Sequence, residues 1–302
     1  MSETSPVRRC GFVALVGAPN AGKSTLLNSL VGAKVSIVTP KPQTTRMRVR
    51  GVAMRGEAQI VFVDTPGIFA PKRRLDQAMV AAAWAGAGEA DLIALIVDAT
   101  QRDPDMFDEI AKALGKLAPR KILILNKVDA VKPESLLTLS AKLIQKLGFE
   151  RTFMVSALRG DGVEDFLSHC AESVPSGPWH FPEDQLTDLS LALTAAELTR
   201  EKLFLKTHQE IPYSATVEPE KFETREDGSY VIHQVIVVAR EAHKKIVVGK
   251  GGQAIRAIGE AARKELEAIF DVKVHLFLFV KVRENWADDP ARFADMGLEF
   301  PR

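Results

Sequence analysis

The sequence predicts a doubly wound α/β domain with a mostly parallel sheet, followed by a small α+β domain. Short apolar runs alternate with helical segments up to about residue 173, as in a parallel sheet with crossover helices. A stretch rich in proline then excludes any regular element. Beyond it the expected order is helix, two strands, two helices and a strand. We therefore expect domains at 1–175 and 186–302, joined by a semi-rigid linker at 176–185.

Composition limits the classes of function. A chain of 302 residues with 46% hydrophobic and 26% charged residues is ordinary for two globular domains. The net charge of +1 predicts no polyanion partner by itself, so any basic surface must be local. The two cysteines, Cys10 and Cys170, lack metal-binding spacing and fit a reduced cytoplasmic compartment. No apolar run approaches the ~18 residues of a membrane span, and the N-terminus lacks the apolar core of a signal peptide. We expect a soluble cytoplasmic protein whose membrane contact is at most peripheral.

The first element predicts a phosphate site. The apolar run 12–16 is expected to be a buried strand, and a helix is expected to follow the loop. Between them stands G-x-x-x-x-G-K-[ST], in the order strand, loop, helix that this motif requires. Glycines let backbone N–H groups surround a phosphate, the lysine reaches the β- and γ-phosphates, and the serine hydroxyl can ligate Mg²⁺. The alternative is a tight turn with a surface lysine. The expected contacts are Gly17, Ala18, Pro19, Asn20, Ala21, Gly22, Lys23, Ser24 and Thr25.

Three further motifs each close an expected strand. The first concerns Mg²⁺ and the γ-phosphate, and the other two identify the base. Asp64-Thr65-Pro66-Gly67 offers a carboxylate that can hold Mg²⁺ through water and a glycine N–H near the γ-phosphate. In Asn126-Lys127-Val128-Asp129, the aspartate can accept both N1–H and the 2-amino group of guanine, which adenine cannot match. In Ser156-Ala157-Leu158, the Ala157 N–H can meet guanine O6. An ATP-binding P-loop protein would not explain the Asn-Lys-x-Asp motif. The sequence therefore predicts a GTP site.

The stretch between the first helix and Asp64 predicts a switch. It contains Thr44 and Thr45, of which we prefer Thr45 as the threonine that completes the Mg²⁺ shell; the alternative is an ordinary threonine at a strand edge. The two prolines of "TPKPQTT" indicate a mobile loop that a γ-phosphate would order. Ile68 stands where many small GTPases carry a water-orienting glutamine, so slow intrinsic turnover is expected. We assign catalysis to Lys23, Thr45 and Gly67.

The other elements of the first domain follow from periodicity. An alanine-rich helix is expected over 74–90, weakened at its end by Gly86 and Gly88, and a buried strand over 91–99. Further strands precede Asn126 and Ser156. Helical segments follow Asp105, Pro133 and Asp161.

The second domain predicts a single-stranded RNA site. An amphipathic helix is expected over 189–211, then two strands joined at Asp227-Gly228, helices over 241–249 and 252–270, and a strand over 272–283. Gly249-Lys250-Gly251-Gly252 joins two helices and lacks the Lys-[ST] ending of a P-loop. It fits G-x-x-G, the clamp of a KH domain, here of type II, which grips about four nucleotides. The alternative is a plain helix–loop–helix turn.

The closing strand alternates two kinds of side chain. Its aliphatic positions are expected to face the core, whereas the other face mixes phenylalanines with basic groups. That face could stack bases, or the phenylalanines could pack under the first helix of this domain. The tail after residue 283 could be docked or mobile, and could add RNA contacts.

The chain resembles the Era family of ribosome-associated bacterial GTPases nearly end to end. The resemblance is carried by "GAPNAGKSTLLN", "PQTTR", "DTPGIFAPKRRL", "NKVD", "SAL", "FPEDQLTD", "REKLF", "VVGKGG" and "VRENWADD". It implies GTP hydrolysis with Mg²⁺, binding of the 3′ end of 16S ribosomal RNA, assistance to 30S subunit maturation, and peripheral association with the inner membrane. We expect a monomer. Ala21 and Phe69 depart from the commoner valine and histidine.

Alternatives remain at this point. The family's K⁺-activated relatives carry an asparagine at the position of Asn20, which makes K⁺ a second candidate cofactor; otherwise Asn20 only shapes the turn. The chain could instead be an RNA-binding assembly factor with little GTP turnover. A membrane-acting GTPase is a third possibility, but it leaves the G-x-x-G loop unexplained.

Overall fold

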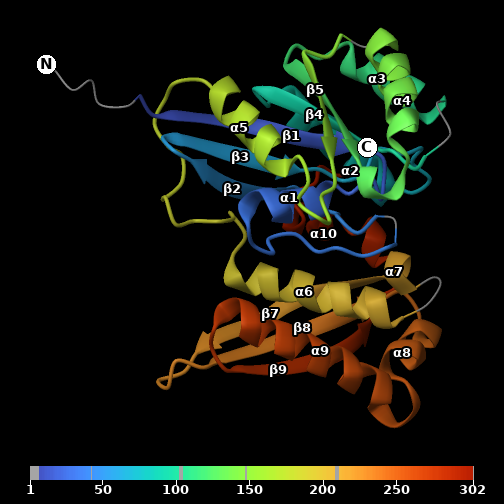
Figure 1. Ribbon diagram of the computed structural model, residues 1–302. Helices are drawn as coiled ribbons and strands as arrows, with labels where there is room; N and C mark the ends of the chain where they lie inside the picture. The colour runs from blue at the N-terminus through green and yellow to red at the C-terminus, as the bar shows by residue number, and fades with distance from the viewer. Residues whose placement is uncertain (1–6, 42, 102–104, 147, 208–210, 302) are drawn as a thin grey trace, which may run out of the picture. The chain divides into compact units, whose positions relative to one another are not determined.

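The chain forms two compact units in the computed structural model, which describes residues 7–41, 43–101, 105–146, 148–207 and 211–301 (Figure 1). The first unit comprises the residues up to Ser36, Thr45–Asp188 and Gly297–Pro301. The second comprises Ile37–Thr44 and Leu189–Met296. Pro42 of the expected switch loop lies outside the described residues. Within the described residues, no helix combines the length and apolar character needed to cross a membrane.

A six-stranded sheet in the order β2-β3-β1-β4-β5-β6 forms the centre of the first unit. All neighbours pair in parallel except β2 and β3, which are antiparallel. The mostly parallel sheet expected from the sequence is therefore confirmed. The strands are β1 Arg9–Gly17, β2 Val49–Arg55, β3 Ala58–Asp64, β4 Leu92–Asp98, β5 Arg120–Asn126 and β6 Arg151–Val155.

Helices cover both faces of this sheet. Apolar residues of α2, α3 and α4 form one buried cluster with β1, β4 and β5, while α1 and α5 contact each other and β3 on the opposite face (Figure 1). The helices are α1 Lys23–Val31, α2 Arg74–Gly88, α3 Asp105–Leu114, α4 Pro133–Lys146 and α5 Val163–Ser173, with a 3₁₀ turn η1 at Val128–Ala130. The glycines near the end of α2 do not stop it before Gly88, because Gly86 and Ala87 are buried.

The proline-rich segment lies along the first unit. Gln59 accepts from the N–H groups of His180 and Phe181 and donates to the Phe181 carbonyl, and the Val52 N–H donates to the Leu186 carbonyl. These bonds extend the first unit to Asp188, beyond the boundary near 175 expected from the sequence.

A three-stranded sheet in the order β7-β8-β9 forms the second unit with its helices. β7 and β8 are antiparallel, whereas β8 and β9 are parallel. α6 and α9 pack on each other, α6 also contacts β7, and both α8 and α9 contact β9. The elements are α6 Leu191–Lys206, α7 Ile211–Ser214, β7 Ala215–Thr224, β8 Tyr230–Val238, α8 Glu241–Val248, η2 Lys250–Gly252, α9 Gln253–Phe270, β9 Val274–Val282, η3 Trp286–Asp288 and α10 Pro290–Asp295.

Two details of the second unit differ from or refine the expectations. α6 ends at Lys206 instead of continuing to residue 211. The tail is docked within the part that the structure describes: Trp286 and Phe293 are 2% and 0% exposed, and the Trp286 indole donates to the Ser214 carbonyl. The buried rings account for the order of η3 and α10.

Candidate functional site

The lysine of the phosphate-binding loop donates hydrogen bonds to carbonyls of the same loop. α1 begins at Lys23, after Gly22 at φ 94°, a conformation that favours glycine. The Lys23 ammonium is 6% exposed and donates to the carbonyls of Gly17, at 3.1 Å, and Ala18, at 2.9 Å. Burial lowers the pKa of Lys23 to about 8, with the charge of Asp64 acting in the opposite direction. A polyphosphate would favour the charged form of this lysine.

Three hydroxyls converge on the carboxylate at the end of β3. Asp64 is completely buried, and its Oδ2 accepts from Ser24 at 2.6 Å, Ser36 at 3.0 Å and Thr45 at 3.3 Å. Ser24 Oγ and Thr45 Oγ1 also lie 2.9 Å apart. Burial raises the pKa of Asp64, opposed by Lys23 and the three hydroxyls. We refer to Asp64, Ser24, Ser36 and Thr45 as the Asp64 cluster.

The Asp64 cluster fits a divalent metal ion. Asp64 Oδ1 is buried without a hydrogen-bond partner among the described residues, which is costly for a carboxylate unless another group satisfies it. Hydroxyl and carboxylate oxygens are the donors that Mg²⁺ prefers. The residues that would hold it are Ser24, Thr45 and Asp64, the last through water.

The two candidate switch threonines have different surroundings. Thr45 Oγ1 belongs to the Asp64 cluster, whereas Thr44 Oγ1 bonds the Thr39 hydroxyl at 2.6 Å and the Lys41 carbonyl at 2.7 Å. Sequence reasoning missed Ser36, because a lone serine among apolar residues does not indicate a contact 28 positions away.

Gly67 and Ile68 lie directly against the phosphate loop. A Cβ on Gly67 would be 2.8–2.9 Å from atoms of Pro19, so only glycine fits there. The Ile68 N–H donates to the Gly17 carbonyl at 3.0 Å, and its side chain is 8% exposed within the sheet core. Ile68 therefore offers no polar group to a water molecule.

Thr65 and Asn20 are further predicted contacts, one in the loop after β3 and the other in the phosphate loop. Thr65 Oγ1 donates to the Leu15 carbonyl at 2.8 Å, which anchors the loop after β3. Asn20 has a φ of 62°, a turn conformation that asparagine adopts more readily than most residues. Both observations fit a role for these residues in shaping the loop.

Asn126 connects the phosphate loop to the loop after β6. Its Nδ2 donates to the Ala21 carbonyl at 2.8 Å, and its Oδ1 accepts the Ala157 N–H at 3.0 Å. A Cβ on Gly22 would lie 2.2 Å from Asn126 Nδ2. The Ala157 N–H that we assigned to guanine O6 thus already has an acceptor, which a bound base would share or replace. Leu158 beside it is exposed.

Asp129 and Lys127 are also held by neighbours. The Lys127 ammonium bonds Asp98 Oδ2 at 2.6 Å, and the Arg159 Nε lies 3.7 Å from Asp129 Oδ2. The hydroxyl of Ser156 holds the pKa of Asp129 below its usual range. The ionised carboxylate is the form that accepts two N–H donors.

The G-x-x-G loop faces open space. Gly251 and Gly252 have φ of 59° and 77°, and no atom lies within 4 Å of a Cβ built on either. A Cβ on Gly249 would instead lie 2.7 Å from the side chain of Ala254, so this glycine permits close packing at the start of α9. Lys250 is exposed. The loop therefore presents bare backbone and one cation to a ligand.

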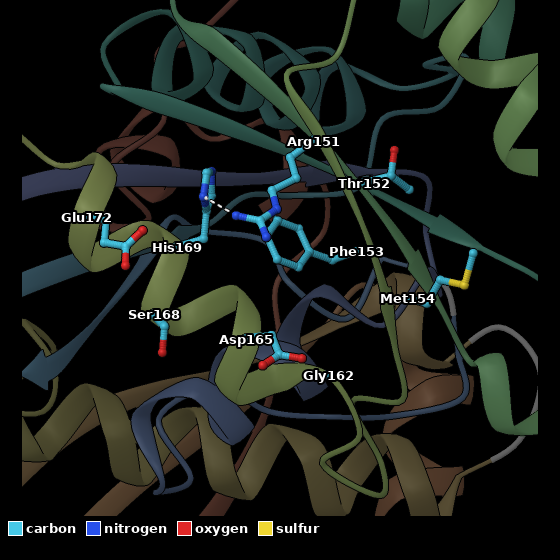
Figure 2. A pocket seen from close by; sticks show the side chains of 9 residues that line it. All are labelled: Arg151, Thr152, Phe153, Met154, Gly162, Asp165, Ser168, His169 and Glu172. Carbon is cyan, nitrogen blue, oxygen red and sulfur yellow. Dashed lines mark hydrogen bonds between the residues drawn. The ribbon is translucent and has the colours of Figure 1, made fainter.

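A separate cavity of about 460 Å³ lies between β6 and α5 (Figure 2). Arg151 Nη1 lies 3.4 Å from His169 Nδ1 there, and Ser173 Oγ 3.4 Å from His169 Nε2. Burial and the charge of Arg151 hold the pKa of His169 below its usual range. The phosphate loop and Asp64 take no part in this cavity. Its other lining residues are Thr152, Phe153 and Met154 of β6 and, on the α5 side, Gly162, Asp165, Ser168 and Glu172.

Comparisons with known proteins identify a GTPase region and a KH region in this chain. Residues 12–127 match the model of the 50S ribosome-binding GTPase family, and residues 210–287 match that of the KH domain. The chain is 59% identical over 294 residues to GTPase Era of Rhizobium meliloti, covering 97% of this chain and 94% of that one. It is also 59% identical over 297 residues to GTPase Era of Mesorhizobium japonicum, covering 98% and 96%.

Two solved structures are similar over 96% of this chain and 99% of theirs, each at 40% identity. One is a single-residue variant of Aquifex aeolicus Era bound to GDP and AlF₄⁻, with a TM-score of 0.91. The other is Era in complex with MgGDPNP and nucleotides 1506–1542 of 16S ribosomal RNA, with a TM-score of 0.90.

The position of Asp129 predicts a change of base preference. Asp129→Asn should shift preference from GTP toward xanthosine triphosphate, because an amide can donate to the O2 of xanthine but cannot accept two guanine donors. Competition binding of the two triphosphates measures this. Arg159→Gln, which changes a neighbour of Asp129, is the control and should keep the GTP preference. An unchanged preference in Asp129→Asn would remove Asp129 from this role.

The lowered pKa of Lys23 predicts proton uptake on nucleotide binding. Between about pH 7.5 and 8.5, GDP binding without Mg²⁺ should take up protons, because phosphate restores the charged lysine. Calorimetry in two buffers of different ionisation enthalpy measures the uptake. Guanosine, which lacks phosphates, is the control ligand and should take up none. If the heat of GDP binding is the same in both buffers, Lys23 is already fully charged in the free protein.

Proposed function

The chain belongs to the Era family of GTPases, and we propose that it couples its GTP cycle to binding of the 3′ end of 16S ribosomal RNA during maturation of the 30S subunit. It is a P-loop GTPase with a C-terminal KH domain. The observation that carries the proposal is the presence, in one chain, of the Asp64 cluster beside a complete phosphate loop and of a G-x-x-G loop with an open approach.

The residues of the first unit support GTP hydrolysis with a slow intrinsic rate as the proposed activity. Lys23 and the loop N–H groups would bind the β- and γ-phosphates, and the Gly67 N–H would face the γ-phosphate. Ser24, Thr45 and Asp64 would hold Mg²⁺, which would neutralise charge on the phosphate oxygens when bound. The Thr45 contacts in the Asp64 cluster support Thr45 over Thr44 as the switch threonine. Because Ile68 is buried and apolar, orientation of the attacking water must come from another group.

The G-x-x-G loop supports the RNA half of the proposal. Its open glycines and the exposed Lys250 suit a phosphodiester backbone, and Lys245 and Arg256, on either side of the loop in the sequence, are also exposed. A 40% identical Era structure contains nucleotides 1506–1542 of 16S ribosomal RNA. We propose the corresponding RNA as the partner here. This RNA is much longer than the segment of about four nucleotides that such a clamp grips.

Chain connectivity supports coupling between the two activities. Ser36 and Thr45 donate to Asp64, whereas the residues between them belong to the second unit. There Glu201 accepts the Val38 N–H at 2.8 Å, and Arg200 donates to the Thr44 carbonyl at 2.7 Å. A γ-phosphate that reorders Thr45 therefore acts on a segment that α6 also holds.

The cellular setting is proposed from the family resemblance. We infer that the chain works as a monomer in the cytoplasm and associates peripherally with the inner membrane. K⁺ is proposed as a second cofactor at Asn20.

The K⁺ proposal predicts a salt-specific rate. GTP turnover without RNA should be slow, and several-fold faster in K⁺ than in Na⁺ at equal ionic strength, and Asn20→Ala should remove the difference. Phosphate release measures both rates. Ile68→Val is the control: it should cost about 0.5–1.5 kcal/mol of stability and leave the rate unchanged, because no hydrogen bond is lost. Equal wild-type rates in the two salts would exclude the cation at Asn20.

The RNA clamp predicts a charge-specific loss of binding. Gly251→Asp should weaken binding of the 16S 3′-end RNA at least about ten-fold and keep GTP binding, because it adds a negative charge where a phosphate passes. Gly251→Asn has the same size and tolerates the same φ, so it should lose much less. Fluorescence anisotropy measures both. If Asp and Asn variants bind RNA as wild type does, the loop is not the clamp.

Coupling predicts a difference between nucleotide states. RNA should bind more tightly with a GTP analogue than with GDP, by a factor of ~5–150, and by linkage RNA should tighten the GTP analogue over GDP by the same factor. The same anisotropy titration, with each nucleotide present, measures it. Identical affinities would mean that the two domains are merely tethered.

A further inference from the structure

β9 separates two different surfaces of the second unit. It is one of the two edge strands of the sheet. Four of its side chains pack against the buried clusters beneath the helices: Leu276, Leu278, Val280 and Val282. The alternate side chains, Phe277 and Phe279, project from the opposite face and are 45% and 47% exposed. Neither phenylalanine packs under the first helix of this domain, which was one of the two interpretations that the sequence left open.

These two phenylalanines form an array with a histidine. His233 of β8 stands opposite Phe277 in the parallel register. The His233 and Phe277 ring centroids are 4.8 Å apart with planes inclined by 20°, and the His233 and Phe279 centroids are 6.3 Å apart, inclined by 10°. We call His233, Phe277 and Phe279 the ring array. Its nearly parallel rings form one aromatic patch rather than scattered exposed side chains.

Ion pairs occupy β7 and the end of β9, the strands on either side of β8. Lys281 pairs with Glu220 at 3.0 Å, Arg283 with Glu218 at 3.7 Å and Lys221 with Glu223 at 2.8 Å. The three cations are between 45% and 57% exposed, so their pairs contribute little to stability and a phosphate can replace the carboxylate. The core of a protein-binding patch is depleted of charge. Charges this close to two phenylalanines favour a charged partner with flat apolar surfaces.

We propose that the ring array is a second RNA-binding surface, on which bases of the RNA held by the G-x-x-G loop stack outside the clamp. This inference rests on the RNA-binding function proposed above. Every base has a face that stacks on an aromatic ring, so such a surface needs no particular sequence. α8 and α9 flank the clamp, and both contact β9. β9 therefore has the helices of the clamp on one face and the phenylalanines of the ring array on the other. RNA longer than the clamp's about four nucleotides can pass over this edge.

A length series of RNA tests the proposal with the full chain and a GTP analogue. The probes are RNAs that share the clamped segment and grow from about four nucleotides to the full 1506–1542 sequence. The test variant combines Phe277→Leu with Phe279→Leu, which keeps apolar bulk and removes the rings. The matched variant, Phe277→Trp with Phe279→Trp, keeps flat rings. Leu205→Ala, a 47% exposed apolar position on α6, is the surface control.

Wild-type affinity should rise with RNA length beyond the clamped segment. The double leucine variant should lose about ten-fold at the longest RNA and nothing at the shortest, and the loss should be the same at low and high salt, because stacking releases few counterions. The double tryptophan variant and the α6 control should bind as wild type does. GTP turnover without RNA should be unchanged in all four proteins.

Three outcomes would overturn the ring array as an RNA surface. They are identical length dependence in wild type and the double leucine variant, an equal loss at every length, and an equal loss in the leucine and tryptophan variants. The proposed function fails separately: in that case wild-type protein itself binds none of the RNAs.

Discussion

The structure of the nucleotide site depends on one buried carboxylate. Asp64 ends β3 with no exposed surface, and such a group is stable only when its charge is matched by donors. Its Oδ2 accepts hydrogen bonds from the hydroxyls of Ser24, at the start of α1, and of Ser36 and Thr45. A single oxygen atom therefore connects the phosphate loop, β3 and both ends of the stretch from Ser36 to Thr45. Oδ1 has no partner among the described residues, so the site is built to accept a further positive group.

The same arrangement is compatible with the proposed switch at Thr45 and the residues before it. The hydroxyl contacts of Ser24 and Thr45 are hydrogen bonds to one acceptor, which a metal ion and phosphate would reorganise rather than add to. Residues 37–44 are held independently in the second unit, where Ile37 is buried in an apolar cluster and Lys41 donates to the carbonyls of Phe204 and Thr207. Under the proposed function, a change at Thr45 would therefore act on a segment with its own attachments.

Local patterns predicted most of this architecture, whereas long-range pairs could not be predicted. The strand ends that carry Asp64 and Asn126 follow from apolar runs and motif order. Asn126 also donates to the Ala21 carbonyl of the phosphate loop. By contrast, no periodicity signals that Ser36 reaches Asp64 or that Gln59 holds residues 180 and 181. These contacts join segments 28 to 122 positions apart, and only the folded chain brings them together. The expected domain limits differ from the compact units for this reason.

The two glycine loops show how one residue type serves opposite needs. Gly22 is required by the protein itself, because any Cβ there would collide with the Asn126 side chain, and its neighbouring lysine turns inward onto loop carbonyls. Gly251 meets no atom of the protein, so its requirement is a left-handed backbone and free space for something else. A strand-to-helix loop buries its N–H groups around a small anion. A helix-to-helix loop on the surface instead leaves its backbone open, which suits the RNA strand proposed above.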